Sequence, residues 1–153
     1  MGIPIEEFQG LQKNGFITLF PAEVKNGEVT LMRWQFQGIE GGNKNVPNKN
    51  PIMYTIFMNT ENYPNLEDQK IWITAPKPTE IKHGNIFGEQ DITDANVKKY
   101  VKKEKLPRFC HGNLYEILKL SKMELNLKSI LKIIQNMFQS ENWLNNARSP
   151  VIF

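Results

Sequence analysis

The stretch that decides the fold reads Phe16-Ile-Thr-Leu-Phe-Pro-Ala-Glu-Val24, then Lys25-Asn26-Gly27, then Glu28-Val-Thr-Leu-Met-Arg-Trp-Gln-Phe-Gln-Gly-Ile39. Asn-Gly is the favoured central pair of a tight β-hairpin turn, because both residues tolerate a positive φ. After the turn, Val29 and Leu31 alternate with Thr30 and Met32, and the aromatic residues Trp34 and Phe36 follow. This pattern indicates a strand with at least one buried face. We therefore predict two antiparallel strands, over 16–24 and 28–39.

Two further strands are expected downstream of this hairpin. Residues 38–51 are rich in Gly, Asn and Pro and read as a loop. Pro51–Met58 and Lys70–Ala75 are short runs of β-branched and aromatic residues, and Pro76 and Pro78 end the second of them. The chain therefore predicts a four-stranded antiparallel meander.

Helices are expected at both ends of the meander. Over Ile3–Asn14 the apolar residues Ile5, Phe8 and Leu11 follow helical spacing, and Gly15 is placed to end the helix. Near the other end, a six-residue apolar stripe has the i, i+3, i+4, i+7 pattern of a helix that packs on a core; it comprises Leu127, Ile130, Leu131, Ile134, Met137 and Phe138.

Periodicity fades between these regions, over residues 79–107. A helical turn or two is expected through Asn96–Lys103, with Thr93 or Asp94 as its N-cap. The rest of this segment reads as an irregular insertion at about 87–107. The predicted fold class is α+β, in a single domain over residues 1–153.

Composition narrows the class of protein. A chain of 153 residues with 40% hydrophobic and 23% charged residues suits one compact domain. No apolar run is long enough to cross a bilayer, and the N-terminus lacks the layout of a signal peptide. A net charge of +3, from 19 basic and 16 acidic residues, is too balanced for a dedicated nucleic-acid binder. One cysteine rules out an internal disulfide and favours a reducing, intracellular compartment.

Several short motifs resemble those of the ubiquitin-conjugating (E2) family. Leu31-Met-Arg-Trp34 followed by Gln37-Gly-Ile-Glu-Gly41 resembles the family's Trp-bearing strand and the turn after it. Tyr63-Pro64 is similar to the Tyr-Pro before the family's fourth strand, and Leu127–Ser140 resembles the helix that follows the active site. The fold of that family, called the UBC fold, has the same order of elements: a helix, a four-stranded meander and a core helix. The resemblance implies a UBC-like domain.

The catalytic signature of the family is His-Pro-Asn followed about ten residues later by the reactive cysteine. Counted back from the stripe helix, the cysteine position falls at Asn113 or Leu114, neither of which forms a thioester. His83-Gly84-Asn85 stands for His-Pro-Asn, but Cys110 is far downstream of it. This pattern resembles the ubiquitin E2 variants, which keep the fold without the nucleophile, so we expect a pseudoenzyme.

Cys110 is the alternative catalytic candidate, because it is the only thiol. Nearby basic residues, including Arg108 and His111, would favour a thiolate. The competing interpretation is a small, partly buried residue beside Phe109, and we weigh that interpretation more heavily. We expect no cofactor. Two histidines and one cysteine also do not supply a four-ligand Cys/His zinc site, so no metal is expected.

Two groups of residues are candidates for binding a partner. In the E2-variant family, pairing with a partner uses the N-terminal helix and the adjacent loop, which points to Phe8, Leu11 and Phe16 here. Their alternative role is to pack the helix on the sheet. The second group is a lysine tract, which is either a solvated surface or a docking element for an acidic partner; it comprises Lys98, Lys99, Lys102 and Lys103.

Three functions follow from this reading. The favoured one is a non-catalytic E2-variant-like protein that binds an active E2 and positions ubiquitin for it, and the resemblance then implies a cytoplasmic or nuclear location. The first alternative is a structural subunit of a large assembly, for example mitochondrial or ciliary, with neighbouring subunits as partners and no ubiquitin chemistry. The second is an active conjugating enzyme that uses Cys110.

Overall fold

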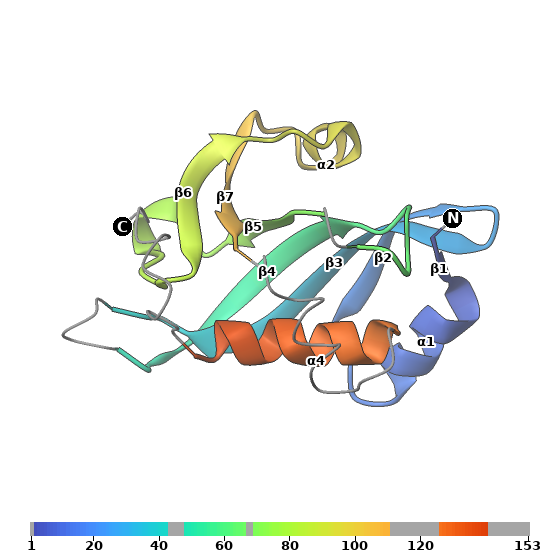
Figure 1. The fold of residues 1–153 in the computed structure, drawn as a ribbon, viewed down its shortest axis with the longest axis horizontal. Helices are drawn as coiled ribbons and strands as arrows, with labels where there is room; N and C mark the ends of the chain where they lie inside the picture. The colour runs from blue at the N-terminus through green and yellow to red at the C-terminus, as the bar shows by residue number, and fades with distance from the viewer. Residues whose placement is uncertain (1, 43–47, 67–68, 111–125, 141–153) are drawn as a thin grey trace.

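The computed structural model describes residues 2–42, 48–66, 69–110 and 126–140, which form an α+β fold (Figure 1). One sheet has the strand order β1-β3-β4-β5-β7-β6, with β2 also paired to β3, and every pairing is antiparallel. In chain order the elements are β1 (Ile3–Pro4), α1 (Ile5–Lys13), β2 (Leu19–Lys25), β3 (Glu28–Ile39), β4 (Pro51–Asn59), β5 (Ile71–Ala75), the 3₁₀ turn η1 (Pro78–Glu80), β6 (Ile86–Asp91), α2 (Ala95–Val101), β7 (Lys105–Phe109) and α4 (Leu127–Phe138).

The predicted β2–β3 hairpin is confirmed. Asn26 and Gly27 have φ values of 50° and 78°, as the tight turn requires. The strands then pair from Lys25↔Glu28 to Leu19↔Trp34. Strand β2 begins at Leu19 rather than at Phe16, because residues 14–18 lead out of α1 as turns and irregular chain. The predicted first helix begins at Ile5, since Ile3–Pro4 pairs with β3 instead.

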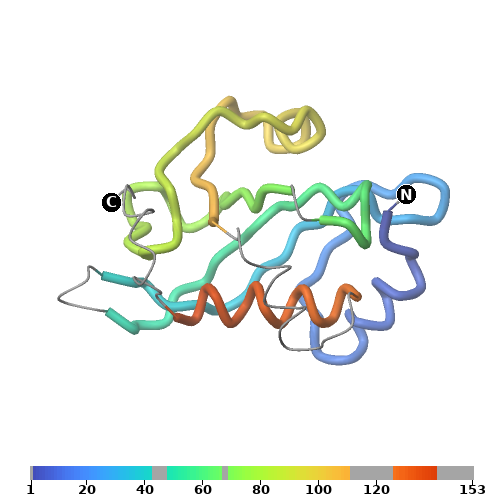
Figure 2. The backbone as a smooth tube through the Cα atoms, in the orientation of Figure 1, coloured from blue at the N-terminus to red at the C-terminus, as the bar shows by residue number. Residues whose placement is uncertain are grey.

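The segment expected to be irregular contains the strands β6 and β7, so the prediction of four strands was wrong, whereas the helix predicted within it is confirmed as α2. Strand β7 pairs with β5 through Ile71↔Phe109, and β6 pairs with β7 through Ile86↔Phe109. Figure 2 shows the chain rising along β6, passing through α2 and returning along β7. The two strands are short, and a register shift between Phe87 and Gln90 interrupts the alternation on which sequence reading depends.

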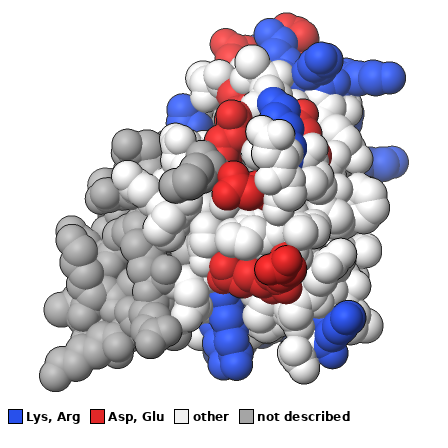
Figure 3. Space-filling model, turned by 90° about the vertical axis from the view of Figure 1, so that its right-hand side faces the viewer, with Lys and Arg blue, Asp and Glu red and all other residues white. Residues whose placement is uncertain are grey.

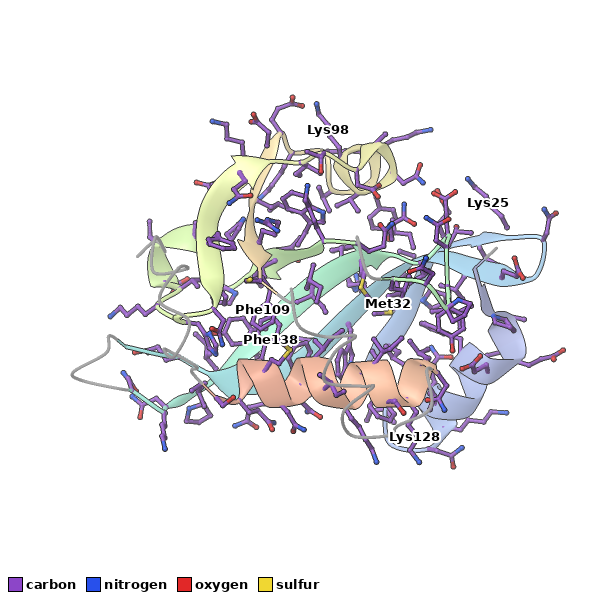
Figure 4. All side chains as sticks on the ribbon, in the orientation of Figure 1. Lys25, Met32, Lys98, Phe109, Lys128 and Phe138 are labelled. Atoms are coloured by element: carbon purple, nitrogen blue, oxygen red, sulfur yellow. The ribbon has the colours of Figure 1, made fainter. Side chains whose placement is uncertain are left out.

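Helix α4 covers one face of the sheet, called here the inner face, as its apolar stripe predicted. Its N-cap is Asn126, whose side chain accepts a hydrogen bond of 2.9 Å from the Ser129 N–H. The Phe138 ring, which is fully buried, stacks on Phe109 at 4.0 Å between ring centroids and meets Phe36 edge-on at 4.9 Å. Figure 4 shows Phe109 and Phe138 next to each other between the sheet and the helix. This aromatic cluster is the centre of the larger core.

Helix α2 lies against the opposite, outer face (Figure 1). Asp94 is its N-cap, and its carboxylate accepts hydrogen bonds from the N–H groups of Asn96 and Val97. Val97 is fully buried in a second, smaller apolar cluster, whose other buried members are Leu31, Phe57, Trp72, Ile92 and Leu106. Among the described residues, α2 thus covers part of the outer face.

Within the four described ranges, no helix has the length and apolar content needed to span a membrane.

Candidate functional site

An uncharged groove of mixed polar and apolar lining lies beside the loop that joins α1 to β2. Its volume is about 430 Å³, and Trp34 and Phe36 of β3 contribute to its lining. The Ile17 side chain at this groove is 77% exposed, and Met53 of β4 is 47% exposed. The remaining lining residues are Gly15, Phe16, Thr18, Gln35, Gln37 and Gln135, so none of the lining side chains carries a charge.

The aromatic side chains at this groove are held by the core. The rings of Trp34 and Phe36 are 4.2 Å apart between centroids, and Phe36 contacts the Phe138 ring from α4. Phe16 packs on Trp34 at 6.0 Å. The groove is therefore preformed, because its aromatic residues are anchored in the main hydrophobic cluster.

The three residues predicted to bind a partner through the first helix have different environments. Phe8 is fully buried and packs α1 against the sheet, so its side chain is not available as a partner anchor, contrary to that prediction. Leu11 and Phe16 are half-buried against the same core. Ile17, which was not predicted as a site residue, is the exposed one. Phe16–Val24 was expected to be a strand, and exposure of every second side chain is ordinary in a strand, so Ile17 did not stand out.

The lysine tract lies on α2 and directly after it, at the top of the view in Figure 1. Lys99, Lys102 and Lys103 are exposed. The Lys98 Nζ lies 3.0 Å from a Glu104 carboxylate oxygen, and Lys98 points away from the sheet in Figure 4. Figure 3 shows acidic side chains between the basic ones at this end of the molecule. The tract is thus a mixed-charge surface.

Cys110 lies directly after β7 and is half-buried. Its backbone N–H donates a 2.9 Å hydrogen bond to the Asn85 carbonyl, which continues the pairing of Ile86 with Phe109. The β6–β7 hairpin thus brings the only thiol opposite the His83-Gly84-Asn85 tripeptide. The spacing of Cys110 from this tripeptide still differs from that of the family's signature, but the β6–β7 pairing brings the two segments side by side.

His83 fixes the position of this tripeptide relative to α4. Its Nε2 lies 3.2 Å from the Phe138 carbonyl oxygen, and its Nδ1 accepts a hydrogen bond from the Asn85 N–H. These partners assign the neutral tautomer with the proton on Nε2. Burial lowers the pKa of His83 to about 4, and the hydrogen bonds to backbone carbonyls only partly offset that effect. His83 is therefore a neutral structural link and not a base at pH 7.

Some of the sequence predictions concern other parts of the chain. Asn113 and Leu114, the expected cysteine position, and His111 lie outside the described residues. Over the residues that the structure does describe, no three His, Cys, Asp or Glu side chains gather as a metal site requires.

Comparison with known proteins gives no relative. No protein-family model, curated protein or solved structure matches this chain. The resemblance to the E2 family therefore stays a prediction that rests on short motifs and element order.

Proposed function

We propose that this chain is a UBC-like protein of the E2-variant type, which acts by binding other proteins and not by catalysis. Its partners in this proposal are an active ubiquitin-conjugating enzyme and ubiquitin. The observation that carries the proposal is the preformed, uncharged groove beside Ile17. Single exposed apolar residues are common on protein surfaces, but Ile17 and Met53 both lie at a groove with an anchored aromatic lining.

The groove has the composition expected at the centre of a protein interface. Such centres are depleted in charge, enriched in aromatic residues and bordered by polar groups. Phe16 supplies aromatic surface over the buried rings of Trp34 and Phe36, and Gln35, Gln37 and Gln135 supply polar groups. The groove also adjoins the first helix and the loop after it, which are the elements that the family resemblance assigns to partner binding.

In this role the chain contributes positioning. Holding two reacting groups in line converts a bimolecular step into an effectively unimolecular one, which lowers the barrier by as much as about 7–11 kcal/mol in the best-oriented systems. The thioester chemistry then belongs to the partner enzyme, and this chain needs no nucleophile of its own.

A single-turnover assay tests the proposal. A purified active E2, loaded with ubiquitin as its thioester, is mixed with free ubiquitin in the presence or absence of this chain. We expect the chain to accelerate formation of ubiquitin dimers. The substitution Ile17→Asp should reduce this acceleration by about tenfold or more, because a carboxylate would be desolvated in an apolar interface.

Two matched variants control this experiment. Ile17→Val keeps an apolar side chain at the groove and should retain the acceleration. Val24→Asp introduces the same charge at an exposed aliphatic residue outside the groove lining, and it should also retain it. If Ile17→Asp accelerates the reaction as well as the original chain does, the groove is not the partner site. If the chain has no effect on any active E2 tried, the alternative of a structural subunit gains support.

The position of Cys110 favours a second candidate, an active conjugating enzyme. In the E2 family the reactive cysteine lies near the Asn of His-Pro-Asn, and Cys110 is paired here with the backbone of Asn85. Asn85 is itself buried. Incubation with a ubiquitin-activating enzyme, ATP and ubiquitin separates the two candidates. We expect no adduct, whereas a reducible adduct that Cys110→Ser abolishes would establish the enzyme.

A further inference from the structure

We propose that α2 is a lid over the outer face of the sheet, and that a ring of four polar side chains holds this lid shut. The ring, called here the Asn59 latch, joins the end of β4 to the start of α2; it comprises the side chains of Asn59, Glu61, Asp94 and Asn96. Such a lid would operate whatever partner binds the groove beside Ile17.

The surface beneath α2 belongs to a row of paired side chains that crosses the outer face from β2 to β6. Residues directly opposite each other in antiparallel strands place their side chains on the same face. The row ends in two cation–π contacts, in which the guanidinium carbons of Arg33 and Arg108 lie 4.4 and 4.9 Å from ring centroids. In order from β2 to β6 the row comprises Phe20, Arg33, Phe57, Trp72, Arg108 and Phe87.

This row is partly exposed at its ends and buried in its middle. The Phe20 side chain is 40% exposed, whereas Phe57 and Trp72 are 5% and 1% exposed. Helix α2 supplies the cover (Figure 1), because Val97 packs in the same cluster as Phe57 and Trp72. The Tyr100 ring also lies 5.4 Å from the Phe57 ring. Opening of α2 would therefore extend the exposed aromatic surface from Phe20 toward Trp72.

Apolar contact alone holds α2 weakly. Val97 is its one buried residue, and Tyr100 is 42% exposed. Isolated helices shorter than about 12 residues are marginal in water, so α2, with seven residues, depends on its tertiary contacts. We therefore expect the polar contacts at the start of α2 to contribute much of what keeps the helix on the sheet.

The Asn59 latch alternates amides and carboxylates. The Asn59 Nδ2 lies 2.7 Å from Asp94 Oδ2 and 3.1 Å from Glu61 Oε1. The Asn96 Nδ2 donates to the same Glu61 oxygen at 2.6 Å. The other Asp94 oxygen accepts from the Asn96 N–H at 2.9 Å, which closes the ring. Two carboxylates that would otherwise repel each other are thus held together by two amides, through hydrogen bonds of the stronger, charge-assisted kind.

Asn59 is the buried member of the latch. Its side chain is 8% exposed, and its carbonyl oxygen accepts from the Glu61 N–H at 2.8 Å, which fixes the direction of the Nδ2 group. A buried amide that loses its partners carries a desolvation penalty. The closed position of α2 is favoured accordingly, because it gives the Asn59 amide a carboxylate acceptor on α2.

The lid can move without unpairing the sheet. The Ile92 N–H donates to the Glu104 carbonyl at 2.9 Å, directly beyond Asp91 and Lys105, the last paired residues of β6 and β7. Residues 93–103, which include α2, therefore form a loop whose two ends are held together. Loss of the contacts from Asn59 to Asp94 and from Asn96 to Glu61 would free this loop while the β6–β7 pairing remains.

The nearly isosteric substitution Asn59→Asp tests the latch. It replaces an amide donor with a third carboxylate beside Glu61 and Asp94, so repulsion takes the place of attraction. We expect the amides of α2 in the full-length chain to exchange about tenfold faster or more, as measured by NMR hydrogen exchange. Asn50→Asp makes the same charge change at an exposed residue outside the latch, and it should leave exchange of α2 unchanged.

A second substitution reverses the closest contact of the latch. In Asn59→Asp combined with Asp94→Asn, the donor and the acceptor change places. Asn is as good an N-cap as Asp, so the start of α2 is kept. We expect exchange of the α2 amides in the double variant to return to within about threefold of the original rate. Asp94→Asn alone removes the charged acceptor of the Asn59 amide and should accelerate exchange.

The indole N–H of Trp72 reports on the row beneath the lid. Its resonance is assigned with Trp72→Phe, and Trp34, which is buried in the larger core, serves as the internal control. We expect Asn59→Asp to accelerate exchange of the Trp72 indole together with the amides of α2. Urea should raise these rates weakly and those of Trp34 and α4 steeply, because opening of a lid exposes less surface than global unfolding does.

Three results would overturn the proposal. If exchange of α2 has the same urea dependence as that of α4, the helix opens only with the whole fold. If Asn59→Asp leaves α2 exchange unchanged, or if the double variant exchanges as fast as Asn59→Asp, the ring is not a latch. If exchange of the Trp72 indole does not follow that of α2, the helix is not the cover of the row.

A milder variant keeps the test decisive if Asn59→Asp does not fold. Asn96→Ala removes the contact with Glu61 at a half-buried residue and leaves Asn59 and Asp94 in place. It should accelerate exchange of the α2 amides by about threefold or more. An unchanged rate in Asn96→Ala would overturn the latch.

Discussion

The inner face of the sheet packs against α4, a helix of 12 residues, whereas the outer face is covered in part by α2, a helix of seven. On the inner face, α4 contributes Ile130, Leu131, Ile134 and Phe138, all fully buried, to one continuous cluster. On the outer face, α2 contributes Val97 as its only buried residue. Regions with little buried apolar surface open at low free energy. We therefore expect the inner layer, which is α4 with the face that it covers, to hold the fold together, and the outer layer, which is α2 with the smaller apolar cluster, to open separately.

The largest expected effect comes from removing the centre of the inner layer. Phe138→Ala deletes a fully buried ring that stacks on Phe109 and contacts Phe36 and Tyr54. We expect it to lower the free energy of unfolding by about 3–5 kcal/mol, measured by urea denaturation. Lys132→Ala, on the exposed side of the same helix, should change it by less than about 0.5 kcal/mol. Similar losses in the two variants would contradict the assignment of α4 to the core.

The second effect concerns pH and the histidine at the end of the inner layer. The pKa of His83 is about 4 in the folded chain, compared with an ordinary value of 6.5. Between these pH values His83 binds a proton more readily in the unfolded chain than in the folded chain. The contribution of His83 to the free energy of unfolding is therefore complete above pH 6.5 and falls as the pH drops toward 4. The loss amounts to about 3 kcal/mol at most. Denaturation curves recorded across this pH range measure it.

A variant separates His83 from the carboxylates that titrate in the same range. Gln at position 83 has an amide N–H and a carbonyl oxygen for the roles of Nε2 and Nδ1 but does not bind a proton. We expect His83→Gln to be less stable at pH 7 and to show a shallower fall of stability between pH 6.5 and 4. An unchanged slope would show that His83 is not buried and neutral.

The inner layer was predictable because its signals are local and periodic. The apolar stripe of Leu127–Phe138 and the Asn26-Gly27 turn each follow from spacing or from one favoured dipeptide. The outer layer was predictable in part: Asp94 marked the start of α2, but β6 and β7 were missed, because they are short and held by pairing across that intervening helix. The same long-range pairing brings Cys110 opposite Asn85, a neighbourhood that the sequence did not predict.

The candidate site was predictable only as a region. The α1–β2 loop was expected to contribute, but the exposure of Ile17 depends on where β2 begins. That boundary is set by pairing of Leu19 with Trp34.

A third, smaller effect is expected at the N-cap of α2. The Asp94 carboxylate accepts hydrogen bonds of 2.9 and 3.1 Å from Asn96 and Val97 and also one from Asn59. Asp94→Ala should cost about 1 kcal/mol, and Asp94→Ser, which keeps an acceptor, should cost less. Hydrogen exchange distinguishes the layers: amides of α2 should exchange faster in Asp94→Ala while those of α4 do not. Equal acceleration in both helices would mean that the outer layer does not open separately.

The smallest effect is expected for the surface ion pair of α2. Lys98 and Glu104 lie 3.0 Å apart, but their side chains are 44% and 79% exposed. Exposed pairs contribute about 0.2–1 kcal/mol, because solvent screens the attraction and ordering two long side chains costs entropy. A double-mutant cycle with Lys98→Met and Glu104→Gln should give a coupling free energy of about 0.5 kcal/mol or less. The coupling should fall further in concentrated salt. A coupling above about 1 kcal/mol that persists in salt would mean that charges, and not Val97, fix α2 on the outer face. The two layers would then differ in the kind of interaction that holds them as well as in the amount of buried apolar surface.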